Sequence, residues 1–134
     1  MNLKLLFSIF AALLLISCNS EKSVPNTDIE VARAFIQNIL DNKFEEAERF
    51  VLKEETNDEY FKLFKTEYKS KSKEELENYK NADIIINEIA PVNDSVSIIN
   101  YSNSYIRDKS NKLKMVRVEG KWLVDLKYTF SGNM

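Results

Sequence analysis

The hydrophobic pattern of the chain changes its period once, near residue 83, and this change predicts the fold class. From Ile29 to Tyr79, apolar residues recur three and four positions apart, which is the spacing of amphipathic helices. From Asp83 onward, the apolar residues are mostly β-branched or aromatic and occur in short runs typical of strands. Helices followed by antiparallel strands form an α+β fold, with the helices packed on one face of the sheet. The sequence therefore predicts helices on an antiparallel sheet of about four strands.

Four helices are expected before the change of period. They begin, in order, at the capping box Thr27–Glu30, at about Lys43, at Asn57 or Asp58, and at a second capping box, Ser72–Glu75. The first helix is expected to end near Asp41-Asn42, because asparagine tolerates the left-handed conformation that often follows a helix. The short turn there predicts that the first two helices form a hairpin.

Four strands are expected after the change of period, over residues 83–90, 95–105, 112–118 and 121–128. In the second strand, Val96 and Ile98 share one face, whereas Ile99, Tyr101 and Tyr105 share the other. This shift predicts a β-bulge near Ile98-Ile99. The last strand is expected to place four apolar residues on one face, namely Trp122, Val124, Leu126 and Tyr128.

The N-terminus has the three zones of a secretory signal. Met1–Lys4 carries one positive charge, Leu5–Ile16 is apolar except for one serine, and Ser17 precedes Cys18, the only cysteine of the chain. Because a membrane-spanning helix needs about 20 apolar residues, this segment is too short to be one. It is expected to be removed after export.

Leu15, Ser17 and Cys18 resemble the lipobox of bacterial lipoproteins, with an aliphatic residue three positions before the cysteine and a small residue immediately before it. The resemblance implies cleavage between Ser17 and Cys18 and attachment of membrane lipid to Cys18. Two or three acyl chains on one residue give firm anchoring. The alternative is an ordinary secretory signal with an incidental free cysteine.

These features divide the chain into a signal peptide (1–17), a tether (18–26) and a single domain (27–131). The flexible part of the tether, Asn19–Asn26, has an r.m.s. reach of roughly 15 Å. The domain is therefore expected to stay close to its membrane.

Composition excludes several classes of site. The chain has no histidine, so histidine catalysis and zinc sites built from cysteine and histidine are not expected. Removing residues 1–17 takes one lysine from the 19 basic side chains and nothing from the 21 acidic ones, which leaves a net charge of −3. This charge argues against a nucleic-acid partner, because nucleic-acid binders are basic. No cofactor and no metal are expected.

Two short stretches resemble small NTF2-like domains. Asp41–Ala47 is similar to the helix-hairpin turn of these domains, and Glu119–Asp125 is similar to their closing hairpin, with a Gly at position 120 that supplies a positive φ. With the leader and the length, the chain resembles an uncharacterised NTF2-like, DUF4878-type lipoprotein of the Bacteroidota. The resemblance implies a cystatin-like fold, whose curved sheet surrounds a cone-shaped cavity. Family members use this cavity for catalysis, for small-ligand binding, or only for packing.

Aromatic residues on the expected strands are candidates for lining such a cavity, or are simply core residues with polar tips at its rim. They are Tyr101, Tyr105, Trp122 and Tyr128. An acid–base enzyme would also need a buried carboxylate near a tyrosine. Asp83, Glu88 and Asp125 are the only carboxylates of the strand region that could serve, and Asp125 is expected to be solvated. No catalytic residue is assigned.

Two surface features are weaker candidates. Lys62, Lys65 and Lys69 form a stripe on the third expected helix, which could bind an anion or could be a solvated helix face. Asp94-Ser95-Val96 resembles the O-glycosylation site of secreted Bacteroidota proteins, which implies a glycan on Ser95.

The leading hypothesis is a non-enzymatic envelope lipoprotein, with an outer membrane expected, whose domain is an interaction module for an unknown envelope protein. A binder of a small apolar ligand is the alternative, and a hydrolase or isomerase with a carboxylate–tyrosine pair is a third. A filled interior would favour the interaction module, whereas a pocket of a few hundred Å³ would favour ligand binding. A carboxylate with a raised pKa at the floor of the pocket would favour catalysis.

Overall fold

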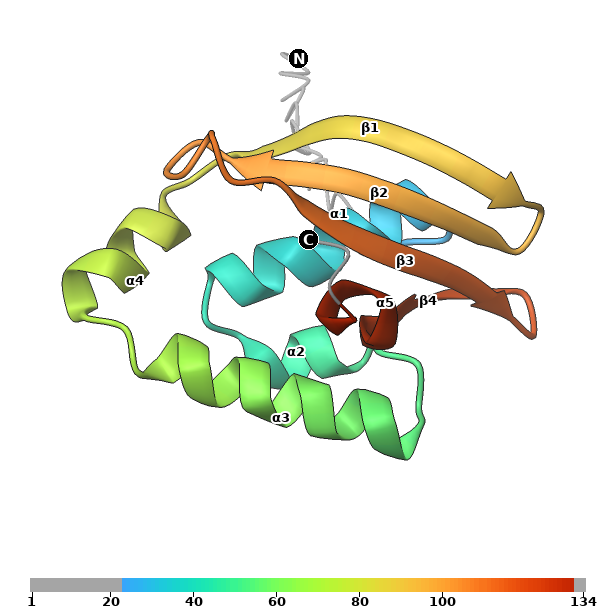
Figure 1. Cartoon of the computed structure of the whole chain (residues 1–134), viewed down its shortest axis with the longest axis horizontal. Helices are drawn as coiled ribbons and strands as arrows, with labels where there is room; N and C mark the ends of the chain where they lie inside the picture. Colours follow the sequence, from blue (N-terminus) through green and yellow to red (C-terminus); the bar gives the residue numbers. More distant parts are fainter. Residues whose placement is uncertain (1–22, 132–134) are drawn as a thin grey trace, which may run out of the picture.

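The computed structural model describes residues 23–131, which form helices followed by a four-stranded antiparallel sheet and a short last helix (Figure 1). The elements are α1 (Asp28–Leu40), α2 (Phe44–Glu48), α3 (Glu55–Lys69), α4 (Lys73–Lys80), β1 (Ile84–Asn93), β2 (Val96–Asn103), β3 (Asn111–Val118), β4 (Lys121–Asp125) and α5 (Leu126–Phe130). The predicted α+β class is confirmed. The signal peptide, Cys18 and most of the tether lie outside the described residues. Within residues 23–131, no helix is long and apolar enough to cross a membrane.

Both predicted capping boxes are formed. At the start of α1, the Thr27 hydroxyl accepts a hydrogen bond from the Glu30 N–H at 3.3 Å, and the Glu30 carboxylate accepts from the N–H groups of Asn26 and Thr27 at 3.0 and 3.2 Å. These two backbone N–H groups lower the pKa of Glu30. Ser72 and Glu75 form the same arrangement at α4. At the other end of α1, Asn42 has a φ of 59°, the left-handed conformation expected there.

The sheet is a meander in the order β1-β2-β3-β4. Its connections therefore alternate between two ends. The β1–β2 and β3–β4 turns lie at one end, which we call the hairpin end, and the β2–β3 loop (residues 104–110) lies at the other. Glu119 and Gly120, in the β3–β4 turn, both have positive φ, at 51° and 77°, as a type I′ turn requires.

The core lies between the sheet and α1, with α2 and α3 covering the far side of α1 (Figure 1). Four of the sheet residues in it, Ile99, Leu113, Met115 and Val124, are at most 1% exposed. The helices contribute Phe35 and Ile36 from α1, Phe44 from α2 and Phe61 from α3, among others. Phe44 contacts Phe61 with ring centroids 5.9 Å apart. The middle of the molecule is therefore filled with side chains.

The predicted bulge in β2 is wrong. The irregularities lie in β1, between Ile86 and Glu88 and between Pro91 and Asn93, whereas β2 pairs with β3 without a break. The position that the apolar pattern missed is Ser97. It is buried and faces inward because its hydroxyl donates a 2.6 Å hydrogen bond to the Asp28 carboxylate.

Other boundaries also differ from the prediction. The first strand continues to Asn93, and the second ends at Asn103, so Tyr105 lies in the β2–β3 loop and not on a strand face.

The last strand ends at Asp125, and Leu126–Phe130 is helical, so Leu126 and Tyr128 do not continue the strand face of Val124. The third helix begins at Glu55 rather than after Asn57. Asn57 does not cap this helix, because its side chain is fully buried and binds the backbone at the β4–α5 junction.

Candidate functional site

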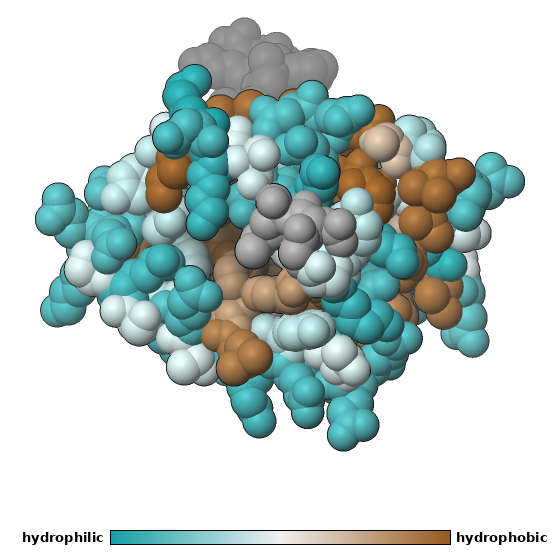
Figure 2. All heavy atoms as spheres, viewed as in Figure 1, coloured by the Kyte–Doolittle hydropathy of each residue, from teal (hydrophilic) through white to brown (hydrophobic). Residues whose placement is uncertain are grey.

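A pocket of about 130 Å³ lies at the end of the helical layer that faces the β2–β3 loop. We call it the tyrosine pocket. Its apolar walls include Ile36, Ile39 and Leu40 of α1 and Phe64 of α3. Three tyrosines also line it, namely Tyr68, Tyr79 and Tyr101. Figure 2 shows that this face is hollowed near its centre, between α3 and the sheet, where hydrophobic atoms reach an otherwise largely hydrophilic surface.

Ring contacts hold the walls of the tyrosine pocket. Tyr79 packs on Tyr68 with ring centroids 5.5 Å apart, and Tyr105 meets Tyr79 edge to face at 5.1 Å. Phe64 contacts the edge of Tyr68 at 6.3 Å. These contacts join α3, α4 and the β2–β3 loop around the opening.

The tyrosine hydroxyls of the pocket differ in their partners. The Tyr68 hydroxyl donates to the Leu40 carbonyl at 3.3 Å, and burial raises the pKa of Tyr68. Burial also raises the pKa of Tyr101, to about 12, although part of its ring remains accessible. Within residues 23–131, the Tyr101 hydroxyl has no hydrogen-bond partner. Tyr101 is therefore a protonated donor that is available to a ligand at neutral pH.

Two lysines stand at the rim of the tyrosine pocket. The Lys71 ammonium lies 5.5 Å from the centre of the Tyr79 ring, and Lys109 approaches from the β2–β3 loop. Neither lysine forms an ion pair with another described residue. Among the described lining residues, Glu67 is the single carboxylate, and it is exposed. Glu75, which is not a lining residue, interacts electrostatically with Lys71 and Tyr79, so the two lysines stand near two carboxylates.

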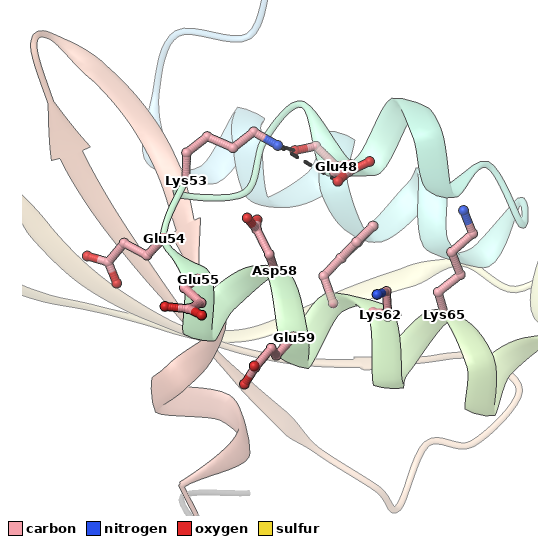
Figure 3. A pocket seen from close by; sticks show the side chains of 9 residues that line it. Glu48, Lys53, Glu54, Glu55, Asp58, Glu59, Lys62 and Lys65 are labelled. Atoms are coloured by element: carbon pink, nitrogen blue, oxygen red, sulfur yellow. Dashed lines mark hydrogen bonds and ion pairs between the residues drawn. The ribbon is translucent and has the colours of Figure 1, made fainter.

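A larger and more open depression runs along the first half of α3 (Figure 3). It has a volume of about 620 Å³ and is lined by five carboxylates, three lysines and one phenylalanine, namely Glu48, Glu54, Glu55, Asp58, Glu59, Lys53, Lys62, Lys65 and Phe61. Lys62 and Lys65 belong to the lysine stripe of the sequence, and here they share the depression with the carboxylates. The stripe is therefore not an isolated cationic surface, and the depression lacks the apolar walls of a small-molecule site.

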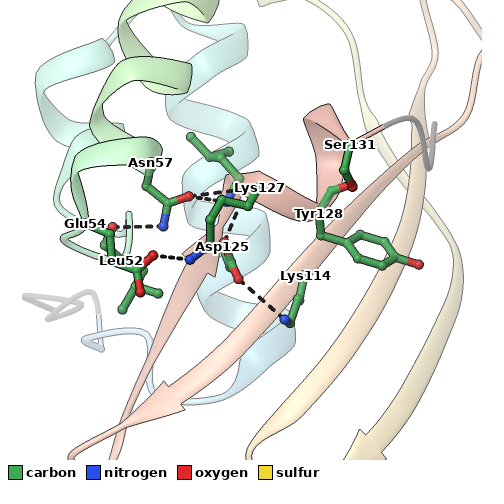
Figure 4. A network of polar contacts seen from close by, with 9 residues as sticks. Leu52, Glu54, Asn57, Lys114, Asp125, Lys127, Tyr128 and Ser131 are labelled. Carbon is green, nitrogen blue, oxygen red and sulfur yellow. Dashed lines mark hydrogen bonds and ion pairs between the residues drawn. The ribbon is translucent and has the colours of Figure 1, made fainter.

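A buried polar cluster lies at the β4–α5 junction (Figure 4). The carboxylate of Asp125 accepts from the Lys127 N–H at 3.2 Å, which caps α5, and lies 3.4 Å from the Lys114 ammonium. Asp125 is 5% exposed, so the expectation of a solvated residue is wrong. The strand stops here and turns into a helix, which folds the side chain inward. Because Asp125 is capping a helix and pairing with lysines, it has a structural role.

Asn57 completes this cluster. Its side-chain oxygen accepts from the N–H groups of Leu126 and Lys127 at 3.0 and 3.3 Å, and its amide donates to the Leu52 carbonyl at 3.1 Å. The Lys127 ammonium also pairs with Glu54, and this contact raises the pKa of Lys127. We call Asn57, Asp125 and their partners the polar hub. Its described bonds join α3 and the segment before it to β3, β4 and α5.

The four aromatic candidates from the sequence occupy different places. Tyr101 lines the tyrosine pocket, and Tyr105 supports it through its contact with Tyr79. Trp122 lies opposite Arg117 toward the hairpin end and packs against the core, whereas Tyr128 lies on α5. Neither Trp122 nor Tyr128 is among the pocket-lining residues.

The remaining candidates lie at the surface. Asp83 and Glu88 are exposed beside or on the edge strand β1. Ser95 is exposed in the β1–β2 turn, where its N–H donates to the Asn93 side chain at 2.9 Å. This position is accessible to a modifying enzyme. Within residues 23–131, no cluster of acidic, histidine or cysteine side chains could hold a metal ion.

Sequence reasoning missed Tyr79, Lys71 and Lys109 as pocket residues. They belong to three different segments, namely the α3–α4 connection, α4 and the β2–β3 loop, and only the packing of α4 against that loop brings them together. A pattern search along a single element carries no signal for such a site. No protein-family model matches the chain, and no curated protein and no solved structure matches it either.

Proposed function

We propose that the protein is an envelope lipoprotein, anchored through an acylated Cys18, whose NTF2-like domain is a non-enzymatic binding module. Its binding site in this proposal is the tyrosine pocket. The observation that carries the proposal is the position of the two ends of α1. The start of α1 is bound to the hairpin end, because Asp28 accepts a hydrogen bond from Ser97, and the end of α1 contributes Leu40 to the pocket.

This arrangement separates the tether from the pocket. Ile36 and Leu40, which line the pocket, follow Asp28 by 8 and 12 residues along α1, so at 1.5 Å per residue they lie about 12–18 Å from the start of the helix. An anchor at Cys18 then holds the hairpin end near the bilayer and directs the pocket away from it. The pocket would take its ligand from the aqueous compartment rather than from the membrane.

The chemistry of the pocket favours binding over acid–base catalysis. A general base must lose its proton near the operating pH. Tyr101, with a pKa raised to about 12, stays protonated and acts as a hydrogen-bond donor. Glu67 is exposed, so it is not in the apolar setting that an acid catalyst needs.

The size of the pocket favours an interaction module over a binder of whole ligands. Small-molecule sites usually measure about 300–1,000 Å³. At about 130 Å³, the tyrosine pocket holds one ring or one side chain of a larger partner. Lipid anchoring would raise the effective concentration of this site toward envelope partners.

The anchor is tested by mass spectrometry of the mature N-terminus and by a Cys18→Ala variant. The proposal predicts that the mature chain starts at Cys18 and carries acyl groups, and that the variant stays unprocessed and without lipid. A start at another residue, or a bare thiol on Cys18, would contradict it.

The binding site is tested with the mature lipidated protein in nanodiscs, with its isoleucine methyl groups labelled for NMR. Benzyl alcohol, a neutral ring, is expected to shift the methyl signals of Ile36, Ile39 and Ile106, which line the pocket. Ile106→Trp is designed to fill the pocket and remove these shifts. Val92→Trp, which adds the same side chain at an exposed position of the hairpin end, is the matched control and should leave them unchanged.

A further inference from the structure

We infer that the tyrosine pocket binds an aromatic ring that carries a carboxylate. This inference rests on the proposed function, because it names the ligand class of the same site. It is drawn from three properties of the pocket, which are its volume, the nature of its walls and the charges at its rim.

The volume fits one ring. In another protein, an apolar cavity of about 150 Å³ binds a single benzene molecule. The tyrosine pocket has about 130 Å³, so it accommodates a group of similar size with its substituent at the opening. A fused or larger ring system would have to displace the side chains of α1, which are buried in the core.

The walls favour a planar apolar group. Ile36, Ile39 and Leu40 cover one side, and the rings of Phe64 and Tyr79 cover others. Aromatic pairs with centroids 4.5–7 Å apart add roughly 0.5–1.5 kcal/mol beyond the burial of apolar area. The Tyr68 hydroxyl is already bonded to the backbone, so this side chain presents mainly its ring.

The charges favour an anion. Lys71 and Lys109 stand at the opening without an ion-pair partner among the described residues, and Tyr101 adds a neutral donor. A cationic ligand would meet Lys71, which already occupies the neighbourhood of the Tyr79 ring. Glu67 and Glu75 oppose an anion, but both are exposed, and the Glu75 carboxylate already accepts a hydrogen bond from the Ser72 N–H in the capping box of α4. A carboxylate held one or two bonds from the ring would reach the two ammonium groups.

Two sources supply this chemistry. One is a free aromatic acid, and the other is an aromatic residue at the C-terminus of a peptide, whose ring and terminal carboxylate are close together. Phenylacetate represents the first source, and N-acetyl-phenylalanine represents the second. Their amides, phenylacetamide and N-acetyl-phenylalaninamide, have the same rings and no charge.

The experiment titrates these four compounds into the mature lipidated protein in nanodiscs and follows the methyl signals of Ile36, Ile39 and Ile106. We expect at least one acid to bind about fivefold more tightly than its amide, the factor given by about 1 kcal/mol in total from one half-buried lysine, Lys71, and one exposed lysine, Lys109. The acid that shows this preference identifies the source. Raising the salt concentration should weaken the binding of the acid, because salt screens its charge, and should leave the binding of the amide unchanged.

Variants locate the charge preference. Lys71→Gln and Lys109→Gln should each weaken acid binding severalfold and leave amide binding unchanged. Lys121→Gln removes an exposed lysine of the hairpin end and should change neither. Tyr101→Phe, which keeps the ring, should weaken the binding of the acids because it removes one hydrogen-bond donor to the carboxylate.

Different results would show that the ligand class is wrong or that the proposed binding site itself is wrong. Equal binding of acids and amides, or stronger binding of benzylamine or of a methyl glucoside, would overturn the inference while the pocket remained a binding site. If none of the compounds shifted the pocket signals, both the inference and the proposed binding site would be wrong, whereas the anchor would still be judged by the mass of the mature N-terminus.

Discussion

The two ends of α3 are held in opposite ways. Near its start, Asn57 is fully buried and makes hydrogen bonds to the backbone of three other residues in the polar hub. Near its end, Tyr68 makes one hydrogen bond to the backbone and otherwise contacts rings. The outer side of the hub end carries the open depression with charged walls, whereas the ring end contains the tyrosine pocket.

This difference shows where a site can form. Backbone hydrogen bonds require short distances and fixed directions, so they draw segments together and fill the space between them. Ring contacts tolerate several geometries, and at the other end of α3 the rings of Tyr68 and Tyr79 line the tyrosine pocket. A buried carboxylate such as Asp125 looks catalytic when considered alone, but its bonds show that it belongs to the polar hub.

The largest predicted effect concerns the hub. Asn57→Ala removes the partners of the Leu126 N–H and of the Leu52 carbonyl, and a buried polar group without a partner costs about 1–3 kcal/mol. We expect the free energy of unfolding to fall by about 3 kcal/mol, measured by denaturant unfolding. Asn81→Ala, at an exposed helix end, is the control and should change it by less than about 0.5 kcal/mol. If Asn57→Ala lowered the free energy of unfolding as little as this control does, the polar hub would not be what holds α3.

A smaller loss is expected from Asp125→Ala. The variant removes the cap of α5 and leaves the half-buried Lys114 without its partner. Loss of an N-cap costs about 1 kcal/mol, and with the ion pair we expect about 2 kcal/mol in denaturant unfolding. Asp108→Ala, in the exposed β2–β3 loop, serves as the matched substitution, and equal stability of the two variants would argue against a structural role for Asp125.

At the pocket end, two tyrosines of the same lining should respond differently. Tyr68→Phe removes the hydrogen bond to Leu40 and should lower the free energy of unfolding by about 1 kcal/mol. Tyr101→Phe removes a hydroxyl with no described partner and should change stability by less than about 0.5 kcal/mol. Thermal unfolding of the two variants side by side measures the contrast, and a larger loss in Tyr101→Phe would reverse the assignment.

A further difference between the tyrosines concerns stability at alkaline pH. The pKa of Tyr101 is about 12 in the folded protein and about 10 when unfolded, so the unfolded state loses its proton first. Its contribution is complete below pH 10 and is lost as the pH rises toward 12. Tyr101→Phe should therefore lose less stability over this range than the wild type. Identical pH profiles from pH 9 to 12 would contradict the raised pKa of Tyr101.

The sequence predicted much of the fold because the relevant signals are local. The capping boxes at Thr27 and Ser72, the left-handed Asn42 and the turn at Gly120 each depend on a few neighbouring residues. The errors came from polar residues that face inward. Ser97 and Asn57 are buried because distant partners satisfy them, 69 positions away in each case, and apolar periodicity does not register such positions.

The site was less accessible to prediction than the fold. Tyr101 was a candidate because the strand pattern put it on the inner face. Lys71, Tyr79 and Lys109 join it only through the packing of α4 beside the β2–β3 loop, which depends on ring contacts between separate segments. Nothing in the local sequence around these residues indicates a shared opening.

The central claim is that the anchor and the pocket are at opposite ends of the domain, and distances from the bilayer test it most directly. With Cys18 acylated, a single cysteine introduced as Val92→Cys or Lys109→Cys offers one reactive thiol for a fluorescent label. In nanodiscs with quenching headgroups, we predict strong quenching of the label at position 92, at the hairpin end, and weak quenching at position 109, at the rim of the tyrosine pocket. Equal quenching at both positions, or stronger quenching at 109, would contradict the account.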